Sequence, residues 1–298
     1  MTSETITTPQ QASPPSPPPA EDVPTIIIKP TKGLASLQLG AVWEYRELLY
    51  FLVWRDVKVR YKQATLGMAW IILQPLASML IYTIIFGRLL NAPSDGIPYP
   101  VFVYAGLLPW QYFANSLNRS STNLVDNAHL ITKVYFPRLI IPLSGVISSL
   151  VDFGIAFIVL LGLMLFYRIP PTPATLLLPV FILLAMITAL GFGLWFSALN
   201  VRFRDIKHLI PFIIQIWMYL TPVVYSVTLI PERFRWVLAL NPMTAVVEGF
   251  RWALLGSAMN AVSFTNGLFW VSVGIALAVF ISGLFYFRSV ERTFADII

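Results

Sequence analysis

The chain of 298 residues is 57% hydrophobic and only 11% charged, and its mean hydropathy is +0.74. This composition is that of an integral membrane protein and excludes an ordinary soluble domain. The net charge of +6 does not require a nucleic-acid partner, because the basic residues lie mostly beside apolar segments, where lipid headgroups and membrane orientation account for them. There is no cysteine, and the two histidines, His129 and His208, lie far apart in the sequence, so neither a disulfide nor a metal site is expected.

The N-terminal segment is rich in proline, with PQQASPPSPPPAEDVP at residues 9–24. Such a segment favours extended, solvated backbone and has no apolar face. We expect residues 1–30 to form a disordered cytoplasmic tail and residues 31–298 to form the membrane domain. The segment lacks the pattern of a cleaved signal peptide, so the first membrane span is expected to insert the chain.

A basic, amphipathic helix is predicted for residues 44–62, directly before the first apolar segment. At 100° per residue, Tyr50, Trp54 and Tyr61 share one face with two valines, whereas Arg55, Lys58 and Lys62 share another. We expect this helix to lie along the cytoplasmic membrane surface, with its basic side toward anionic lipid and its aromatic side at the headgroup boundary. From the residues alone it is either a topology anchor or a functional contact element.

Six segments have the length and apolar character of membrane spans, which predicts an all-α integral membrane protein. They cover residues 66–89, 99–118, 139–167, 175–199, 209–228 and 265–287. The second is the weakest, because Pro109 and Asn115 interrupt it. Pro211 and Pro222 are expected to bend the fifth. Between the fifth and sixth spans, residues 229–256 form two apolar pieces too short to cross, which we interpret as a re-entrant pair of short helices at the outer face.

The distribution of basic residues predicts the orientation. Of the 20 Lys and Arg residues, all but five fall in segments on the same side as the termini; the exceptions are Arg88, Arg168, Arg233, Arg235 and Arg251. Because basic residues are concentrated on the cytoplasmic side, both termini are expected to be cytoplasmic.

Three charged residues near or within the apolar segments are candidates for a special role. Asp152 lies well inside the third span, so it is expected to face protein or water, either as a structural hydrogen-bond acceptor or in a proton relay. Glu248 and Arg251 are three residues apart on the second short outer helix, where they can pair on one face or meet a leaving polymer.

Three blocks of the chain resemble one family of transporters. They are RDVKVRYKQATLGMAWIILQPL from Arg55, IPYPVFVYAGLLPWQYFANSL from Ile97 and NLVDNAHLITKVYFPRLIIP from Asn123. Together they resemble the permease subunits of type-2 ABC exporters for polysaccharide, and are most similar to the permeases for O-antigen and lipopolysaccharide export. The similarity extends from about residue 44 to the C-terminus.

The resemblance implies partners for the chain. Permeases of this family work as homodimers with two separate ATP-binding subunits, and the chain itself contains no GxxxxGK[ST] phosphate loop. We therefore expect no enzyme activity and no cofactor in this chain, with ATP and Mg bound by the partner ATPase. The resemblance also implies ATPase-coupling residues in the amphipathic helix and in the loop before the third span: Arg55, Lys58, Arg60, Lys62, Asp126, His129, Leu130, Lys133 and Tyr135. Asp126 is expected to cap a short helix in that loop.

Aromatic side chains are the candidates for a polysaccharide path, because sugars offer flat C–H faces and hydroxyls. By resemblance the first and fifth spans enclose the channel, which points to Trp70, Tyr82, Phe86, Phe212, Trp217, Tyr219 and Tyr225, with Trp110 and Tyr112 on the second span. Aromatic residues also favour membrane interfaces for ordinary amphipathic reasons. An outer gate is expected at Arg233, Glu248 and Arg251.

The expected function is ATP-driven export of a lipid-linked polysaccharide, O-antigen first, across a bacterial inner membrane in which the chain is a multi-pass protein. Capsule or teichoic-acid-type polymers are alternatives, as is a lipid or drug substrate within the same superfamily. A proton-driven transporter is disfavoured because only one acid lies well inside a span and no repeat is seen. An intramembrane hydrolase is disfavoured because both histidines lie in loops.

Overall fold

The computed structural model describes residues 39–62, 67–256, 267–291 and 294. Within these residues every regular element is a helix and no strand is present. The predicted tail of residues 1–30 lies outside the described residues. The helices in chain order are α1 (Leu39–Glu44), α2 (Arg46–Lys62), α3 (Gly67–Tyr82) with its π-helical continuation η2 (Thr83–Leu89), α4 (Tyr99–Asp126), α5 (Ala128–Lys133), α6 (Ile140–Phe166), η3 (Pro173–Leu177), α7 (Leu178–Arg202), α8 (Ile206–Leu220), η4 (Val227–Leu229), η5 (Glu232–Phe234), α9 (Arg235–Ala239), α10 (Pro242–Leu255) and α12 (Gly267–Glu291).

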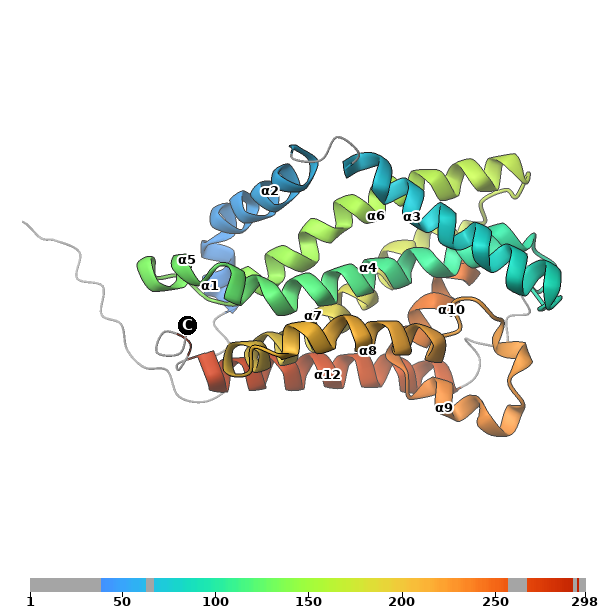
Figure 1. Ribbon diagram of the computed structural model, residues 1–298. Coiled ribbons are helices and arrows are strands. Elements are labelled where there is room, and N and C mark those ends of the chain that lie inside the picture. Colours follow the sequence, from blue (N-terminus) through green and yellow to red (C-terminus); the bar gives the residue numbers. More distant parts are fainter. Residues whose placement is uncertain (1–38, 63–66, 257–266, 292–293, 295–298) are drawn as a thin grey trace, which may run out of the picture. The chain divides into compact units, whose positions relative to one another are not determined.

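Helix α4 forms the centre of the packed core. It packs against α6 and α7 along its length, and α7 packs against α12, so that these helices run side by side in Figure 1. The first half of α4 is buried on all sides, from Val101 through Leu108, which is why its apolar residues do not show a one-sided pattern. Pro109 lies inside α4 without ending it.

Four helical stretches among the described residues are long and apolar enough to cross a membrane: Ala69–Leu89, Ile140–Phe166, Pro173–Arg202 and Gly267–Glu291. The chain is therefore a multi-pass membrane protein of all-α architecture. Helix α4 has 28 residues, but its second half is polar. Helix α8 is apolar but has only 15 residues, a length of roughly 22 Å against a hydrocarbon core of about 30 Å. The count of six spans depends on these two helices and stays a prediction.

Two helix ends differ from the predicted span bounds. The second span was expected to end at residue 118, but α4 continues to Asp126. The fifth was expected to cover residues 209–228, but α8 ends at Leu220 and the chain enters a buried turn at Thr221–Ser226. Pro222 therefore follows the helix and does not bend it, whereas Pro211 does lie inside α8.

Two short helices, α9 and α10, are present where the pair was predicted, and their re-entrant placement at the outer face stays a prediction. Helix α9 has 5 residues and α10 has 14, and Asn241 lies between them. The Asn241 side chain accepts a hydrogen bond from the Met243 amide at 3.0 Å, and Pro242 occupies the first turn of α10, so both residues favour a helix start here.

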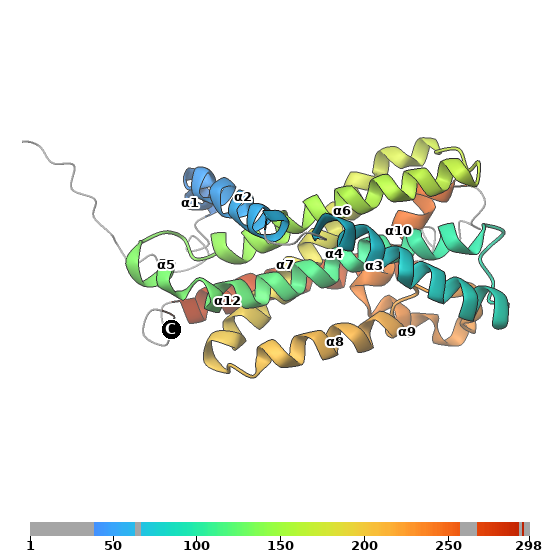
Figure 2. The ribbon, with the colours of Figure 1, turned by 45° about the horizontal axis from the view of Figure 1, so that its top comes forward.

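Hydrogen bonds made by the connecting segments lie at the two ends of the helix bundle. At one end, Ser226 Oγ donates to Asp95 at 2.7 Å, and Thr172 Oγ1 donates to the Ala253 carbonyl at 3.0 Å. At the other end, Arg138 at the start of α6 bonds to Glu291 at the end of α12. Helix α2 lies beside α6, which both views show (Figures 1 and 2).

Candidate functional site

A cavity of about 410 Å³ lies among α3, α4 and α6. We call it the α3–α4–α6 cavity. Its volume falls within the range of roughly 300–1,000 Å³ that is common for small-molecule sites. Its lining comprises Arg60, Tyr61, Trp70, Ile71, Gln74, Pro75, Ser78, Tyr82, Leu107, Leu108, Trp110, Gln111, Tyr112, Ala114, Asn115, Arg119, Ser149, Asp152, Phe153, Ala156 and Met218.

Helical spacing brings these residues to one wall on each helix. On α3, the residues Ile71, Gln74, Ser78 and Tyr82 recur every three or four positions, which places them on one face. On α4, Leu108, Gln111, Asn115 and Arg119 follow the same spacing, as do Ser149, Asp152, Phe153 and Ala156 on α6. Polar residues of α3, α4 and α6 therefore line the same cavity.

The walls of the cavity combine aromatic rings with uncharged hydrogen-bonding groups. The rings belong to Trp70, Tyr82, Trp110 and Tyr112, and the amides to Gln74, Gln111 and Asn115. Aromatic faces suit the C–H faces of a sugar, while amides can both donate to and accept from hydroxyls. This chemistry fits a carbohydrate better than a purely apolar ligand.

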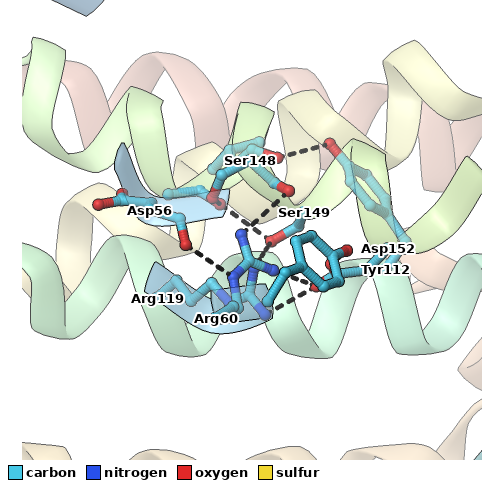
Figure 3. Close-up of polar contacts among 10 residues, drawn as sticks. Asp56, Arg60, Tyr112, Arg119, Ser148, Ser149 and Asp152 are labelled. Carbon is cyan, nitrogen blue, oxygen red and sulfur yellow. Dashed lines mark hydrogen bonds and ion pairs between the residues drawn. The ribbon is translucent and has the colours of Figure 1, made fainter. Parts of the chain in front are cut away.

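One end of the cavity is charged and is centred on Asp152 (Figure 3). The Asp152 carboxylate accepts hydrogen bonds from Arg60 of α2, from Arg119 of α4 at 2.7 Å and from the Tyr61 hydroxyl at 2.8 Å. Its side chain is 8% exposed, so these bonds satisfy a carboxylate that has little access to water. The structure thus supports the expectation of a structural hydrogen-bond acceptor at Asp152, although it leaves the proton relay untested. We call Arg60, Tyr61, Arg119 and Asp152 the charged cluster.

The charged cluster contains more positive than negative charge. Two guanidinium groups share one carboxylate, and the neighbouring Asp56 carboxylate is itself paired with Arg55 at 2.8 Å. Burial, followed by the positive charge of Arg119, lowers the pKa of Arg60 from its usual value, against the opposing effect of Asp152. Burial and the hydrogen bond to Asp152 raise the pKa of Tyr61, so the phenol stays neutral and leaves the excess positive charge in place.

The predicted path residues separate into two groups. Trp70 and Tyr82 line the cavity, together with Trp110 and Tyr112. The others do not line it. Phe86 packs against Tyr82, and Phe212 and Tyr219 are more than half exposed on α8. Trp217 is half-buried and donates to Asn241 at 3.0 Å, and the Tyr225 hydroxyl donates to the Tyr219 carbonyl. A role in a polysaccharide path stays a prediction for both groups.

The basic residues of α2 differ in their surroundings. Arg55 pairs with Asp56, the Lys58 ammonium lies 4.2 Å from the centre of the Trp54 ring, and Lys62 is exposed. Arg60 instead points into the bundle and belongs to the charged cluster. It is therefore the basic residue of α2 that the structure places against other membrane helices.

The second predicted coupling element is the loop that contains α5. His129, Lys133 and Tyr135 are exposed, Leu130 is half-buried, and residues 131–136 with Arg138 surround a depression of about 310 Å³. The short helix is confirmed, but the expectation that Asp126 caps it was wrong. Asp126 is the last residue of α4, and Asn127 precedes α5 without a side-chain cap.

The predicted outer-gate residues do not share one environment. Arg233 is exposed and stacks over Phe234, whereas Glu248 and Arg251 form an ion pair in the interior, with Arg251 fully buried. Of the two alternatives for this pair, the structure supports pairing on one helix face. The gate role of all three residues is untested.

Arg119 is the charged residue of the cavity that the sequence analysis missed. The second span was ended at residue 118, which left Arg119 in the following loop. A signal was available, because an acid inside a span needs a partner, and Arg119 lies one helical turn beyond the polar Asn115.

Comparisons with known proteins agree on one family. The family model described as ABC-2 type transporter matches residues 47–255. The chain is 34% identical over 209 residues to the O-antigen export system permease protein RfbA of Myxococcus xanthus, covering 69% of this chain and 79% of the relative. It is 32% identical over 253 residues to a protein of the same name from Klebsiella pneumoniae, covering 85% and 95%.

A more distant relative is the polysialic acid transport protein KpsM of Escherichia coli, which is 27% identical over 197 residues, covering 64% of this chain and 75% of the relative. The family match spans α2 through α10 and so includes both the α3–α4–α6 cavity and the charged cluster. The chain belongs to the ABC-2 type transporter family and is a membrane-embedded transport subunit.

Proposed function

We propose that the chain is the permease of an exporter that moves a lipid-linked polysaccharide, most specifically O-antigen, across the bacterial inner membrane. The observation that carries this proposal is the 31–34% identity to three O-antigen export permeases, which covers 69–85% of the chain. The aromatic and amide lining of the α3–α4–α6 cavity supports a carbohydrate substrate.

The proposal includes a division of labour among subunits. As in other transporters of this family, ATP is hydrolysed by a separate ABC ATPase subunit, since the chain has no phosphate loop of its own. We propose two such subunits on a homodimer of this chain, with α2 and the α5 loop as their contact elements. The exposed apolar side chains of α3 and α8, such as Leu80 and Ile216, are available to lipid or to the second copy.

The test of this function is deletion of the gene followed by complementation. We expect loss of long-chain polysaccharide from the cell surface and its accumulation inside, with recovery when the chain is supplied from a plasmid. Lipopolysaccharide separated on a gel distinguishes the polymers, because O-antigen gives a ladder on lipid A and capsule does not. Unchanged surface polysaccharide of both kinds in the deletion strain would contradict the proposal.

The second candidate is a capsular polymer, which the similarity to the polysialic acid transport protein supports at lower identity. Loss of capsule with an intact lipopolysaccharide ladder in the same experiment would favour it over O-antigen.

A further inference from the structure

The charged cluster leaves unused hydrogen-bond donors at the end of the α3–α4–α6 cavity. A guanidinium group has five N–H donors. In the described part of the chain, Arg119 bonds to Ser149 at 3.4 Å and to Asp152 at 2.7 Å, and both arginines line the cavity. The side chains of Arg60 and Arg119 are each 25% exposed, so these donors are accessible from the cavity.

The negative charge of Asp152 is directed toward protein groups. One carboxylate oxygen accepts from both arginines, and the other accepts from the Tyr61 hydroxyl at 2.8 Å. Counting the adjacent Arg55–Asp56 pair, three guanidinium groups face two carboxylates, so one positive charge has no counterpart in this cluster. Two like charges held around one carboxylate in a partly buried site favour a second anion.

The remainder of the cavity indicates what such an anion is attached to. Aromatic and amide side chains extend from the charged cluster along α3 and α4, which suits a sugar. Trp70 lines the cavity while it is 58% exposed, and Leu73 and Ile81 of the same helix are also more than half exposed, so the cavity reaches the apolar surface of α3. A ligand with a sugar, an anionic group and a hydrocarbon tail matches these three surroundings.

We propose that Arg119 and Arg60 form an anion site that binds the diphosphate group linking a saccharide to its isoprenoid lipid. Diphosphate suits this place because guanidinium groups bind phosphate oxygens through paired N–H donors. The lipid tail lies along the exposed face of α3, and the first sugar lies against the rings and amides of the cavity. A cavity of about 410 Å³ holds the linkage end of the substrate and not a long stretch of polymer. The identity of the ligand rests on the proposed function, whereas the existence of an anion site does not.

Binding of a short isoprenoid diphosphate tests the site directly. The purified full-length chain, placed in phosphatidylcholine nanodiscs, is titrated with farnesyl diphosphate, with farnesol and with inorganic diphosphate, and empty nanodiscs provide the background. We expect farnesyl diphosphate to bind, farnesol to bind at least about tenfold more weakly, and inorganic diphosphate to compete, since a hydrogen bond to a charged group is worth a factor of this size.

Variants then assign the binding to Arg119. Arg119→Gln is expected to weaken farnesyl diphosphate about tenfold or more, and Arg119→Lys, which keeps the charge, to weaken it less. Lys62→Gln is the matched control, because it removes one positive charge from the same helix as Arg60, while Lys62 is exposed and does not line the cavity. Size-exclusion profiles and thermal unfolding establish that each variant is folded.

Several outcomes would overturn the proposal. These are equal affinity of farnesol and farnesyl diphosphate, wild-type affinity in both Arg119 variants, or an equal loss in Lys62→Gln. Nanodiscs that contain phosphatidylglycerol test whether the site binds an anionic lipid headgroup instead of an isoprenoid diphosphate. Displacement of farnesyl diphosphate by this lipid at equal concentration would reassign the site to lipid headgroups. Because this readout is binding by the isolated chain, it stays separate from the surface-polysaccharide test, which can fail or succeed independently.

Discussion

At the scale of single residues, Arg251 shows how a charge is accommodated inside a membrane protein. Its guanidinium donates to the carbonyls of Phe102, Pro222 and Val223, pairs with Glu248 at 3.3 Å and lies 3.8 Å from the centre of the Phe102 ring. The Pro222 and Val223 carbonyls belong to the turn after α8, where they have no helical partners, whereas the Phe102 carbonyl belongs to α4. Arg251 therefore stabilises the end of α8 from a helix that follows it in sequence.

Replacement of Arg251 by Met removes this set of bonds while it keeps an apolar side chain of similar length. Loss of one partner from a buried charged network costs about 3–5 kcal/mol, which corresponds to roughly 10 °C in the unfolding midpoint. Thermal unfolding in detergent measures the shift. Arg233→Met is the control, because Arg233 is exposed and its replacement is expected to shift the midpoint by only about 1–2 °C. Equal shifts for the two variants would show that the bonds to the turn contribute nothing.

This residue also shows what the sequence could and could not predict. The spacing of Glu248 and Arg251 predicts their pairing, and the structure confirms it. The end of α8 could not be predicted in the same way, because the sequence stays apolar through residue 228. The turn that ends the helix depends on hydrogen bonds from Arg251, which lies 28 positions beyond Val223. The charged cluster likewise depends on residues separated by 92 and 33 positions, which no local pattern reveals.

At the scale of helices, α7 and α12 pack with their backbones in close contact. A Cβ atom on Gly283 would collide with the Gly191 carbonyl oxygen, and one on Gly191 would lie 2.8 Å from the Phe280 Cα atom. Small residues allow membrane helices to approach closely, and the resulting van der Waals contact replaces a hydrophobic driving force that is absent in lipid. These two glycines therefore set the distance between α7 and α12.

Gly283→Ala is expected to destabilise the protein by about 1–3 kcal/mol, because the added methyl group must push α12 away from α7. Gly274→Ala on the same helix is the matched control, since its Cβ would meet no atom within 4 Å. We expect the control to be neutral or stabilising by up to about 1 kcal/mol, from the higher helix propensity of alanine. Thermal unfolding of the two variants in the same detergent makes the comparison, and destabilisation of both to the same extent would argue against close packing as the cause.

Helix existence was predicted better than helix length. The third span was expected at residues 139–167 and α6 covers Ile140–Phe166, because a long uncharged apolar run has no other stable form in lipid. Helix α4 was underestimated because its last turns are polar, yet Asn200 of α7 donates to the Ser121 carbonyl at 3.1 Å, so this polar part packs against protein. Contact with neighbouring helices, which composition does not encode, explains the difference.

At the scale of the whole molecule, the open question is how many times the chain crosses the membrane. Four helical stretches satisfy the length and apolarity of a span, while α4 is partly polar and α8 is short. If both cross, the exposed residues Pro93 and Thr132, which flank α4, lie on opposite sides of the membrane. The same holds for Lys207, at the start of α8, and Leu229, which lies beyond its end.

The natural chain has no cysteine, so single cysteines at these four positions report on each crossing separately. With the basic residues on the cytoplasmic side, Pro93→Cys and Leu229→Cys are expected to react with a membrane-impermeant maleimide in spheroplasts, whereas Thr132→Cys and Lys207→Cys react only after lysis. The four side chains are exposed or nearly half exposed, so failure to react before lysis reports the membrane and not burial. If Thr132→Cys and Pro93→Cys both reacted in intact spheroplasts, α4 would not cross the membrane. If Lys207→Cys and Leu229→Cys both reacted, α8 would not cross it. Complete reversal of the labelling pattern would keep six crossings but place both termini outside, which would contradict the orientation drawn from the basic residues and the proposed docking of an ATPase at α2.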